Sequence, residues 1–234
     1  MTLRRLTARL FAVALLVVPV LATPRVSQAD DAATAKWEKV TSDSGINVFK
    51  KDVEGSPVIA FKGDGVVDAN ILRVISVLTD TSRSKEWVDR LVEAAILEKI
   101  SPLERVQYNH VKTPPGLDDR DFVTRAKLNI DVANKRVIIS IHSTTHASKP
   151  AGANGIVRGE LLSSSFLLVP VEGGKTRVIT EIHADPKGDV PKFVVNMVQK
   201  DWPINTIKGL RKQVGKATDN EELKAHLVSI NFPL

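Results

Sequence analysis

The seventeen residues from Pro114 to Ile130, PPGLDDRDFVTRAKLNI, combine a rigid turn, a charged cluster and an alternating segment. The two prolines fix the backbone and cannot donate hydrogen bonds, so they predict a turn. From Asp121 onward apolar and polar residues alternate, which is typical of a half-buried β-strand. The segment therefore predicts the entry into a sheet that turns one face toward a core.

The same period of two recurs on both sides of this segment. Turn signals at Asn134-Lys135 and Gly173-Gly174 separate neighbouring runs, which favours antiparallel hairpins. The strand expected over residues 58–62 should end near Gly63 and Gly65. The expected strands cover residues 46–50, 58–62, 94–100, 105–112, 121–131, 136–146, 156–169 and 177–184.

Helical periodicity marks the remaining segments. Asp68 is a plausible N-cap for a helix over residues 71–78, and a short helix is expected over 84–90. A long amphipathic helix should follow Asp189, with a kink at Pro203 because proline removes one backbone hydrogen bond. A last short helix is expected over 220–227. The expected apolar face of the long helix holds Val190, Phe193, Val194, Met197, Ile204, Ile207, Leu210 and Val214.

The N-terminus has the pattern of a secretory signal peptide. Arginines precede an apolar run from Leu10 to Leu21, which is short for a bilayer span, and Ser27-Gln28-Ala29 offers small residues for cleavage before Asp30. We expect residues 1–29 to be removed and the protein to be periplasmic or secreted, with an uncleaved anchor as the alternative. One domain is expected over residues 35–227.

Charge and cysteine content exclude several classes of function. The expected signal peptide carries four arginines and no acid, so its removal lowers the formal charge from +6 to +2. This small positive charge no longer favours binding to a nucleic acid. The chain has no cysteine, which rules out disulfides and thiol chemistry. His142 and His146 would lie about 13 Å apart on a strand, too far to share a metal. We expect no metal, no cofactor and no catalytic residue.

Several short motifs occur in a characteristic order and spacing along the chain. They are Trp87, Pro114-Pro115 with Arg120-Asp121-Phe122-Val123, Gly155-Ile156-Val157-Arg158, Val169-Pro170, and Asp185-Pro186-Lys187-Gly188 through Pro191-Lys192. Together they resemble the START family, the steroidogenic-acute-regulatory-protein-related lipid-transfer domain, in the form of a secreted bacterial-type single-domain member. The resemblance implies an α+β helix-grip fold (START or Bet v 1-like): a curved antiparallel sheet wrapped around a long C-terminal helix, enclosing a hydrophobic cavity for one lipid.

Strand alternation, combined with this resemblance, selects candidate lipid-binding residues. Ala126 stands where sterol-binding relatives have an arginine, so the chain departs from the sterol-carrier pattern, which argues against a sterol. The lipid class, sterol, fatty acid or phospholipid, stays open. Arg120, Asp121, Arg158 and Glu160 are expected to form a structural brace. The candidate lipid-binding residues are Tyr108, His110, Phe122, Thr124, Ala126, Leu161, Ser163, Thr180, Ile182, Phe193 and Met197.

The sequence favours a monomeric, non-enzymatic lipid carrier or sensor that makes transient membrane contact. That contact would use the loop 148–155, the turn 113–119 or the basic residues Lys200, Lys208, Arg211 and Lys212. Two alternatives stay open. One is an enzyme of cyclase or hydrolase type on the same fold, with Tyr108, His110 and Ser163 as candidate groups. The other is a non-lipid interaction module of the cell envelope.

Overall fold

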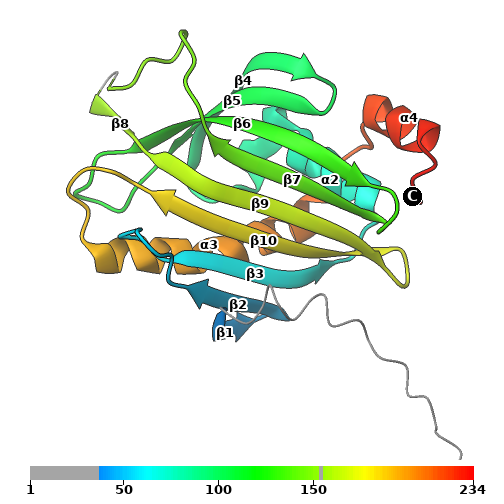
Figure 1. Cartoon of the computed structure of the whole chain (residues 1–234), viewed down its shortest axis with the longest axis horizontal. Coiled ribbons are helices and arrows are strands. Elements are labelled where there is room, and N and C mark those ends of the chain that lie inside the picture. Colours follow the sequence, from blue (N-terminus) through cyan, green and yellow to red (C-terminus); the bar gives the residue numbers. More distant parts are fainter. Residues whose placement is uncertain (1–36, 153–154) are drawn as a thin grey trace, which may run out of the picture. The chain divides into compact units, whose positions relative to one another are not determined.

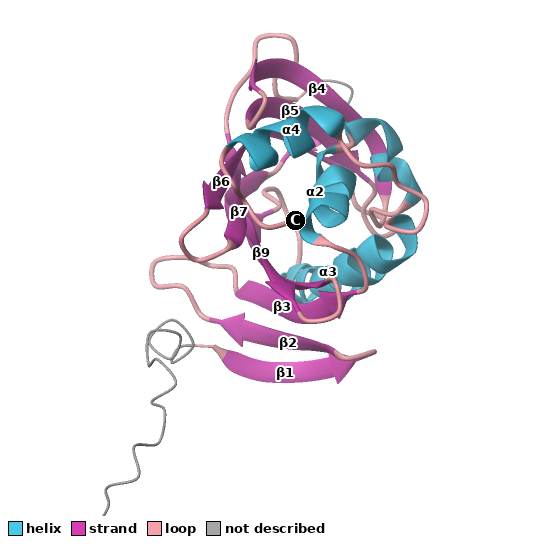
Figure 2. Cartoon of the chain, turned by 90° about the vertical axis from the view of Figure 1, so that its right-hand side faces the viewer, coloured by secondary structure: helices cyan, strands magenta, loops and turns pink. Residues whose placement is uncertain are grey.

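The computed structural model describes residues 37–152 and 155–234, and the expected signal peptide lies outside these ranges. The described chain forms one sheet that curves around helices α2 and α3 (Figures 1 and 2). The strands are β1 (Glu38–Asp43), β2 (Ile46–Lys51), β3 (Ala60–Val67), β4 (Leu91–Ser101), β5 (Glu104–Val111), β6 (Arg120–Asp131), β7 (Arg136–Ser143), β8 (Val157–Arg158), β9 (Glu160–Val171) and β10 (Lys175–Asp185). The helices are α2 (Ile71–Thr79), the 3-10 helix η1 (Thr81–Glu86), α3 (Lys192–Gln213) and α4 (Glu221–Ser229).

The strand order is β1-β2-β3-β10-β9-β7-β6-β5-β4, and every neighbouring pair on this path is antiparallel. The two-residue β8 pairs with β6 in parallel, outside this path. Short turns connect β1 to β2, β4 to β5, β6 to β7 and β9 to β10. The β3–β10 pair joins an early strand of the described chain to its last strand. The expected helix-grip fold is therefore confirmed.

Two glycines account for two of the differences from the expected strands. β3 does not end near Gly63 but runs through it. The strand has a glycine at this position because the residue faces α3, and a Cβ atom there would lie 2.5 Å from the Cβ of Pro203. Gly159 divides the single strand expected over 156–169 into β8 and β9. A Cβ atom on Gly159 would lie 2.5 Å from a ring carbon of Phe122. Strand β1, at the sheet edge, was not predicted at all.

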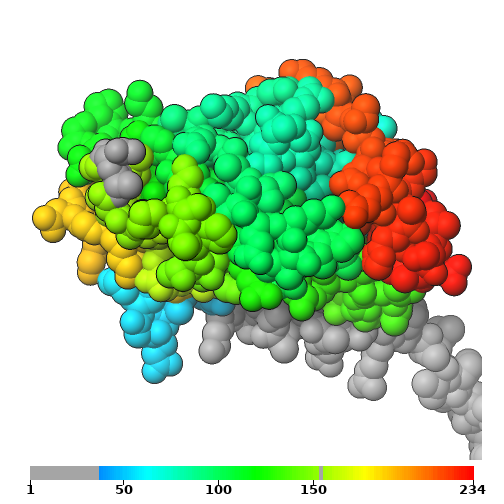
Figure 3. All heavy atoms as spheres, turned by 90° about the horizontal axis from the view of Figure 1, so that it is seen from above, coloured from blue at the N-terminus to red at the C-terminus, as the bar shows by residue number. Residues whose placement is uncertain are grey.

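The helix boundaries shift at their N-termini. Asn70, rather than Asp68, caps α2, and its side chain accepts a hydrogen bond of 2.8 Å from the backbone N–H of Arg73. The expected short helix begins earlier, as η1. α3 begins after Pro191, without a side-chain cap at Asp189, and continues as one helix through Pro203. Figure 3 shows α4 and the C-terminal residues, in red, packed at one end of this unit.

The main core lies between α2, the C-terminal half of α3 and the concave face of the sheet. Ile75 of α2, Leu168 of β9 and Leu210 of α3 are all fully buried there. This core occupies only one end of the space under the sheet. The N-terminal half of α3 covers the other end, where the candidate site lies.

Candidate functional site

A cavity of about 330 Å³ lies between the sheet and the N-terminal half of α3, near the low end of the usual range for ligand sites. Strands β5, β6, β9 and β10 contribute side chains to one wall, and η1, its following turn and α3 contribute to the other. Phe166 and Trp202 meet across it with ring centroids 6.1 Å apart. The main apolar lining residues are Leu161, Phe166, Ile182, Val194, Val198 and Trp202.

Three buried polar atoms of the cavity wall have no hydrogen-bond partner among the residues that the structure describes. They are the indole Nε1 of Trp87, the hydroxyl of Thr124 and the amide oxygen of Gln199. All three residues line the cavity, although they come from a turn, a strand and a helix. A buried polar group without a partner is destabilising. Their common location indicates that a polar ligand atom can complete this wall.

A cation also lies in the wall. Arg105 of β5 donates from Nε to Oε1 of Gln107 at 2.9 Å, and from its terminal nitrogens to the carbonyls of Thr79 (2.9 Å) and Leu78 (3.3 Å). These carbonyls lie at the C-terminal end of α2, where the helix dipole favours a positive charge. Burial lowers the pKa of Arg105, and the charge of Asp80 partly opposes that effect.

Four of the candidate lipid-binding residues lie in the cavity wall: Phe122, Thr124, Leu161 and Ile182. Ala126 and Thr180 are buried but lie outside this lining. Their contact with a ligand stays a prediction. The remaining five residues of the set, Tyr108, His110, Ser163, Phe193 and Met197, also lie outside the lining.

Tyr108 and His110 lie on the opposite face of β5. Tyr108 is buried with Val106 and Val123, and the Lys149 ammonium lies 3.9 Å from its ring centroid. His110 places Nε2 2.9 Å from Oδ2 of Asp119. Because side chains alternate along a strand, the cavity instead receives Gln107 and Asn109. The β5–β6 register, in which Gln107 directly opposes the cavity residue Thr124, sets this face, and alternation within β5 alone did not show it.

A β-bulge moves Ser163 away from the cavity. The register of β9 against β10 shifts between His183 and Ala184, which pair with Ser163 and Leu161. Leu162 is therefore the extra residue, and Ser164 rather than Ser163 lines the cavity. A period-two pattern cannot reveal an inserted residue, so the expected face was wrong beyond this point.

The apolar face expected for α3 was partly wrong at its first turns. Phe193 and Met197 are 72% and 51% exposed. Val194, expected on this face, does line the cavity, together with Val198, Gln199 and Trp202, and Gln199 donates to the carbonyl of Ala184 at 2.7 Å. Sequence reasoning missed Gln199 because it assigned the inward face by hydrophobicity.

The expected charged brace is present beside the cavity. Arg158 donates from Nε to Oδ1 of Asp121 at 2.6 Å and from Nη2 to Oδ2 at 3.0 Å. The buried Arg120 donates to the carbonyls of Pro186 and Lys187, each at 2.9 Å. Glu160 pairs with Lys187 at 2.8 Å, but its side chain is 46% exposed. The bonds of Arg120 and Glu160 fix the loop between β10 and α3 beside the cavity.

Part of the basic face of α3 serves the fold. Lys208 forms an ion pair with Asp43, and Arg211 donates to the carbonyls of Val66 (2.9 Å) and Ser44 (2.7 Å). Both residues therefore hold the β1–β2 hairpin against the helix. The sequence had offered both residues for membrane contact.

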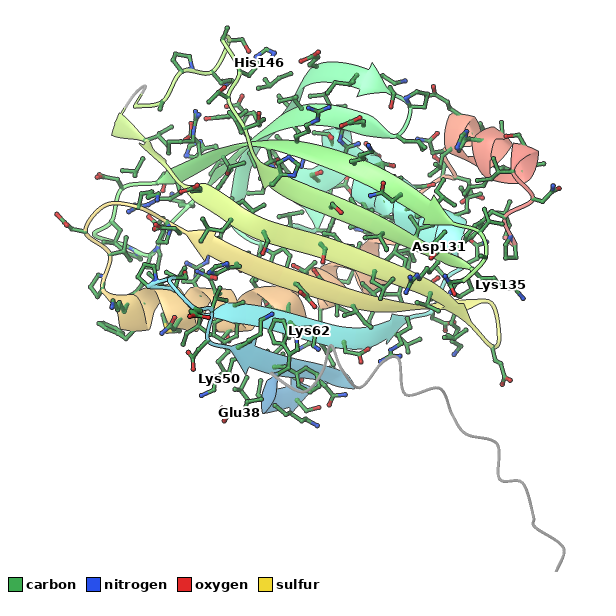
Figure 4. All side chains as sticks on the ribbon, in the orientation of Figure 1. Glu38, Lys50, Lys62, Asp131, Lys135 and His146 are labelled. Atoms are coloured by element: carbon green, nitrogen blue, oxygen red, sulfur yellow. The ribbon has the colours of Figure 1, made fainter. Side chains whose placement is uncertain are left out.

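Within the described ranges, no three His, Cys, Asp or Glu side chains gather in a way that could hold a metal ion. His146 lies in the loop after β7 (Figure 4), where its Nδ1 lies 2.7 Å from the Ser148 hydroxyl. None of the helices within the described ranges is long and apolar enough to cross a bilayer.

A curved antiparallel sheet that closes on a long helix around an apolar cavity defines the helix-grip class of proteins. Within this class the chain belongs to the START domain family, whose pattern matches residues 25–220.

Individual relatives are similar to this chain in sequence or in fold. The mouse (Mus musculus) phosphatidylcholine transfer protein is 26% identical over 181 residues, which are 76% of this chain and 83% of that protein. The human StAR-related lipid transfer protein 5 superposes with a TM-score of 0.72 at 20% identity, over 78% of this chain and 88% of the other. A STAR-related lipid transfer protein from Xanthomonas axonopodis gives 0.68 at 24% identity, over 77% and 99%.

Proposed function

We propose that this protein binds a single lipid-like molecule in the cavity beneath α3 and carries or senses it outside the cytoplasm. The observation that carries the proposal is an apolar cavity whose wall contains unpartnered polar atoms. An amphiphile satisfies both features, because its chain meets the apolar side chains and its polar end meets the polar atoms. Membership of the START domain family supports this proposal.

The energetics favour a lipid chain in such a cavity. Each methylene removed from water contributes about 0.8 kcal/mol. A few directional polar contacts then suffice to set orientation and specificity. The mouse relative is named as a transfer protein for phosphatidylcholine. We extend to this chain only the general property, which is the transfer or sensing of a lipid.

We propose a non-enzymatic role for the site. The groups that the sequence offered for catalysis, Tyr108, His110 and Ser163, do not converge on the cavity. Among its lining residues in the described ranges, Asp89 is the single carboxylate. An acyl-transfer or cyclase mechanism would need an acid, base or nucleophile beside the bound substrate.

The test compares two neighbouring leucines on β9. Leu161 lines the cavity, whereas Leu162 at the bulge is 39% exposed on the other side. Leu161→Trp should fill the cavity and weaken uptake of a neutral fluorescent lipid probe at least tenfold. Leu162→Trp adds the same bulk outside and should bind the probe as the wild type does. Equal binding by both variants would refute the proposed site, and no uptake by the wild type would refute the function.

The proposed location outside the cytoplasm needs a separate experiment. Fusing residues 1–29 to a reporter enzyme that is active only after export should give activity, and the mature protein should begin at Asp30. Export without cleavage would establish the membrane anchor instead. An inactive, cytoplasmic fusion would contradict the proposed location.

A further inference from the structure

We infer that the cavity selects lipids with an anionic polar end, a carboxylate or a phosphate monoester, and holds that end at Arg105, Gln107 and Thr124. This inference rests on the proposed function and specifies the ligand class. We call these three residues the Arg105 cluster. They lie on the cavity face of β5 and β6.

The backbone brings the three side chains together. Arg105 and Gln107 are two residues apart on β5, so they share a face, and Nε of Arg105 donates to Oε1 of Gln107 at 2.9 Å. Gln107 stands directly opposite Thr124 in the β5–β6 pairing. Opposed Cβ atoms in such a pair are about 4.5–5.5 Å apart. One ligand group can therefore reach all three side chains.

The free groups of the cluster are nearly all donors. Three of the five N–H groups of Arg105 are used, by Gln107, Thr79 and Leu78. The amide oxygen of Gln107 accepts from Arg105, so its Nε2 has its two hydrogens available. The hydroxyl of Thr124 is buried and unpartnered. A set of donors fits a carboxylate or phosphate, which are rich in acceptors.

The charge balance of the wall favours the same ligand class. Arg90, Arg105, Lys112 and Arg120 line the cavity, against Asp89 as the one acid among its described lining residues. Asp89 already accepts from Asn205 at 3.0 Å and lies 3.8 Å from Arg90. Within the described ranges Arg105 forms no ion pair with a carboxylate. A cation in a partly desolvated wall gains most from an anionic partner.

A neutral lipid would leave this cluster incompletely satisfied. A single alcohol group brings one proton and two lone pairs, so it cannot occupy several donors and leaves the positive charge unbalanced. The preference should therefore appear between ligands that share one chain and differ only in the polar end. Hydrogen bonds to an ionised group are roughly twice as strong as neutral ones.

The experiment measures displacement of a neutral apolar fluorescent probe from the full protein at pH 8. The competitors are an 18-carbon fatty acid, the alcohol of the same chain and the monoalkyl phosphate of the same chain. The acid, the phosphate or both should bind at least tenfold tighter than the alcohol, and their order distinguishes a carboxylate from a phosphate ligand. Equal affinity of all three for the wild type would overturn the inference while leaving the proposed function intact. If neither probe nor competitor binds, both fail.

Three variants locate the preference. Arg105→Gln should reduce the acid-to-alcohol ratio to about one, while Arg125→Gln should keep it, because Arg125 is exposed on the outer face of β6, pairs with Glu104 and lies outside the cavity. Gln107→Glu places a carboxylate beside Arg105 without changing side-chain length. It should abolish the preference in a protein that remains folded. An unchanged ratio in folded Arg105→Gln or Gln107→Glu protein would overturn the assignment.

Discussion

Gly63 of β3 lies directly against Pro203 of α3, so closely that a methyl group on Gly63 would approach the Cβ of Pro203 to 2.5 Å. The proline ring fills the space that a side chain would take. Because of this contact, α3 packs closely on the sheet at the boundary between the core and the cavity. The contact therefore sets the distance between α3 and the sheet beside the cavity.

Gly63→Ala should lower the free energy of unfolding by about 1–3 kcal/mol, because the added methyl group cannot be accommodated without moving α3. Urea denaturation measures this change. Gly215→Ala is the matched control, since the space around Gly215 is open and its variant should lose no stability. Equal stability of the two variants would contradict the contact.

The brace between Asp121 and Arg158 should matter far more than a surface ion pair. Asp121 is 5% exposed, so Asp121→Asn leaves Arg158 with a weaker partner in a partly buried site and should cost roughly 3 kcal/mol. Glu222→Gln removes the exposed pair with Lys99 and should cost less than about 1 kcal/mol. Chemical denaturation of both variants tests the difference, and similar small losses would mean that the brace carries no stability.

Tyr108 should titrate abnormally. Burial, helped by the negative charges of Asp121 and Glu93, raises the pKa of Tyr108 to about 12. Its pKa in the unfolded chain is about 10. The neutral phenol is thus favoured in the fold, and the stability linked to it is present below pH 10 and declines as the pH rises toward 12. Since Tyr108 is the one tyrosine of the chain, ultraviolet absorbance reports it alone. A midpoint near 10 in the folded protein would contradict its buried position.

Transient membrane contact should depend on the exposed apolar side chains of α3. Phe193 and Met197 lie one turn apart on the outer face of the helix. Replacing both with Ser should weaken flotation with anionic vesicles about tenfold, because their insertion removes apolar surface from water. Val228→Ser on α4, also an exposed apolar residue, is the control. Unchanged flotation of the double variant would exclude this surface.

Membrane docking through the basic residues of α3 should be tested with only two of them. Lys208 and Arg211 hold the β1–β2 hairpin, so replacing them would also disturb the fold. Replacing Lys200 and Lys212 with Gln should reduce binding to anionic vesicles, with a stronger effect at low salt. If binding is the same at every salt concentration, these charges take no part in docking.

Much of the fold followed from local patterns. The alternation after Asp121 correctly predicted β6, and its inward residues Phe122 and Thr124 do line the cavity. The missed features depend on contacts between distant segments. In the sequence Gly63 indicates the end of a strand, and only its contact with Pro203 explains a glycine within β3. The bulge at Leu162 is defined by the pairing of β9 with β10, which the sequence of β9 does not show. Hydrophobicity failed for α3 because Gln199 faces inward to bond with Ala184, while Phe193 faces outward.

Native mass spectrometry of the protein purified from its own cells tests the central claim most directly. The account predicts one lipid per chain, released on denaturation and identified by its fragments, and absent from the Leu161→Trp variant. A carboxylate or phosphate at its polar end would also support the role of the Arg105 cluster. Wild-type protein that carries no lipid, and that takes up none when fatty acids, sterols or phospholipids are offered, would contradict the account.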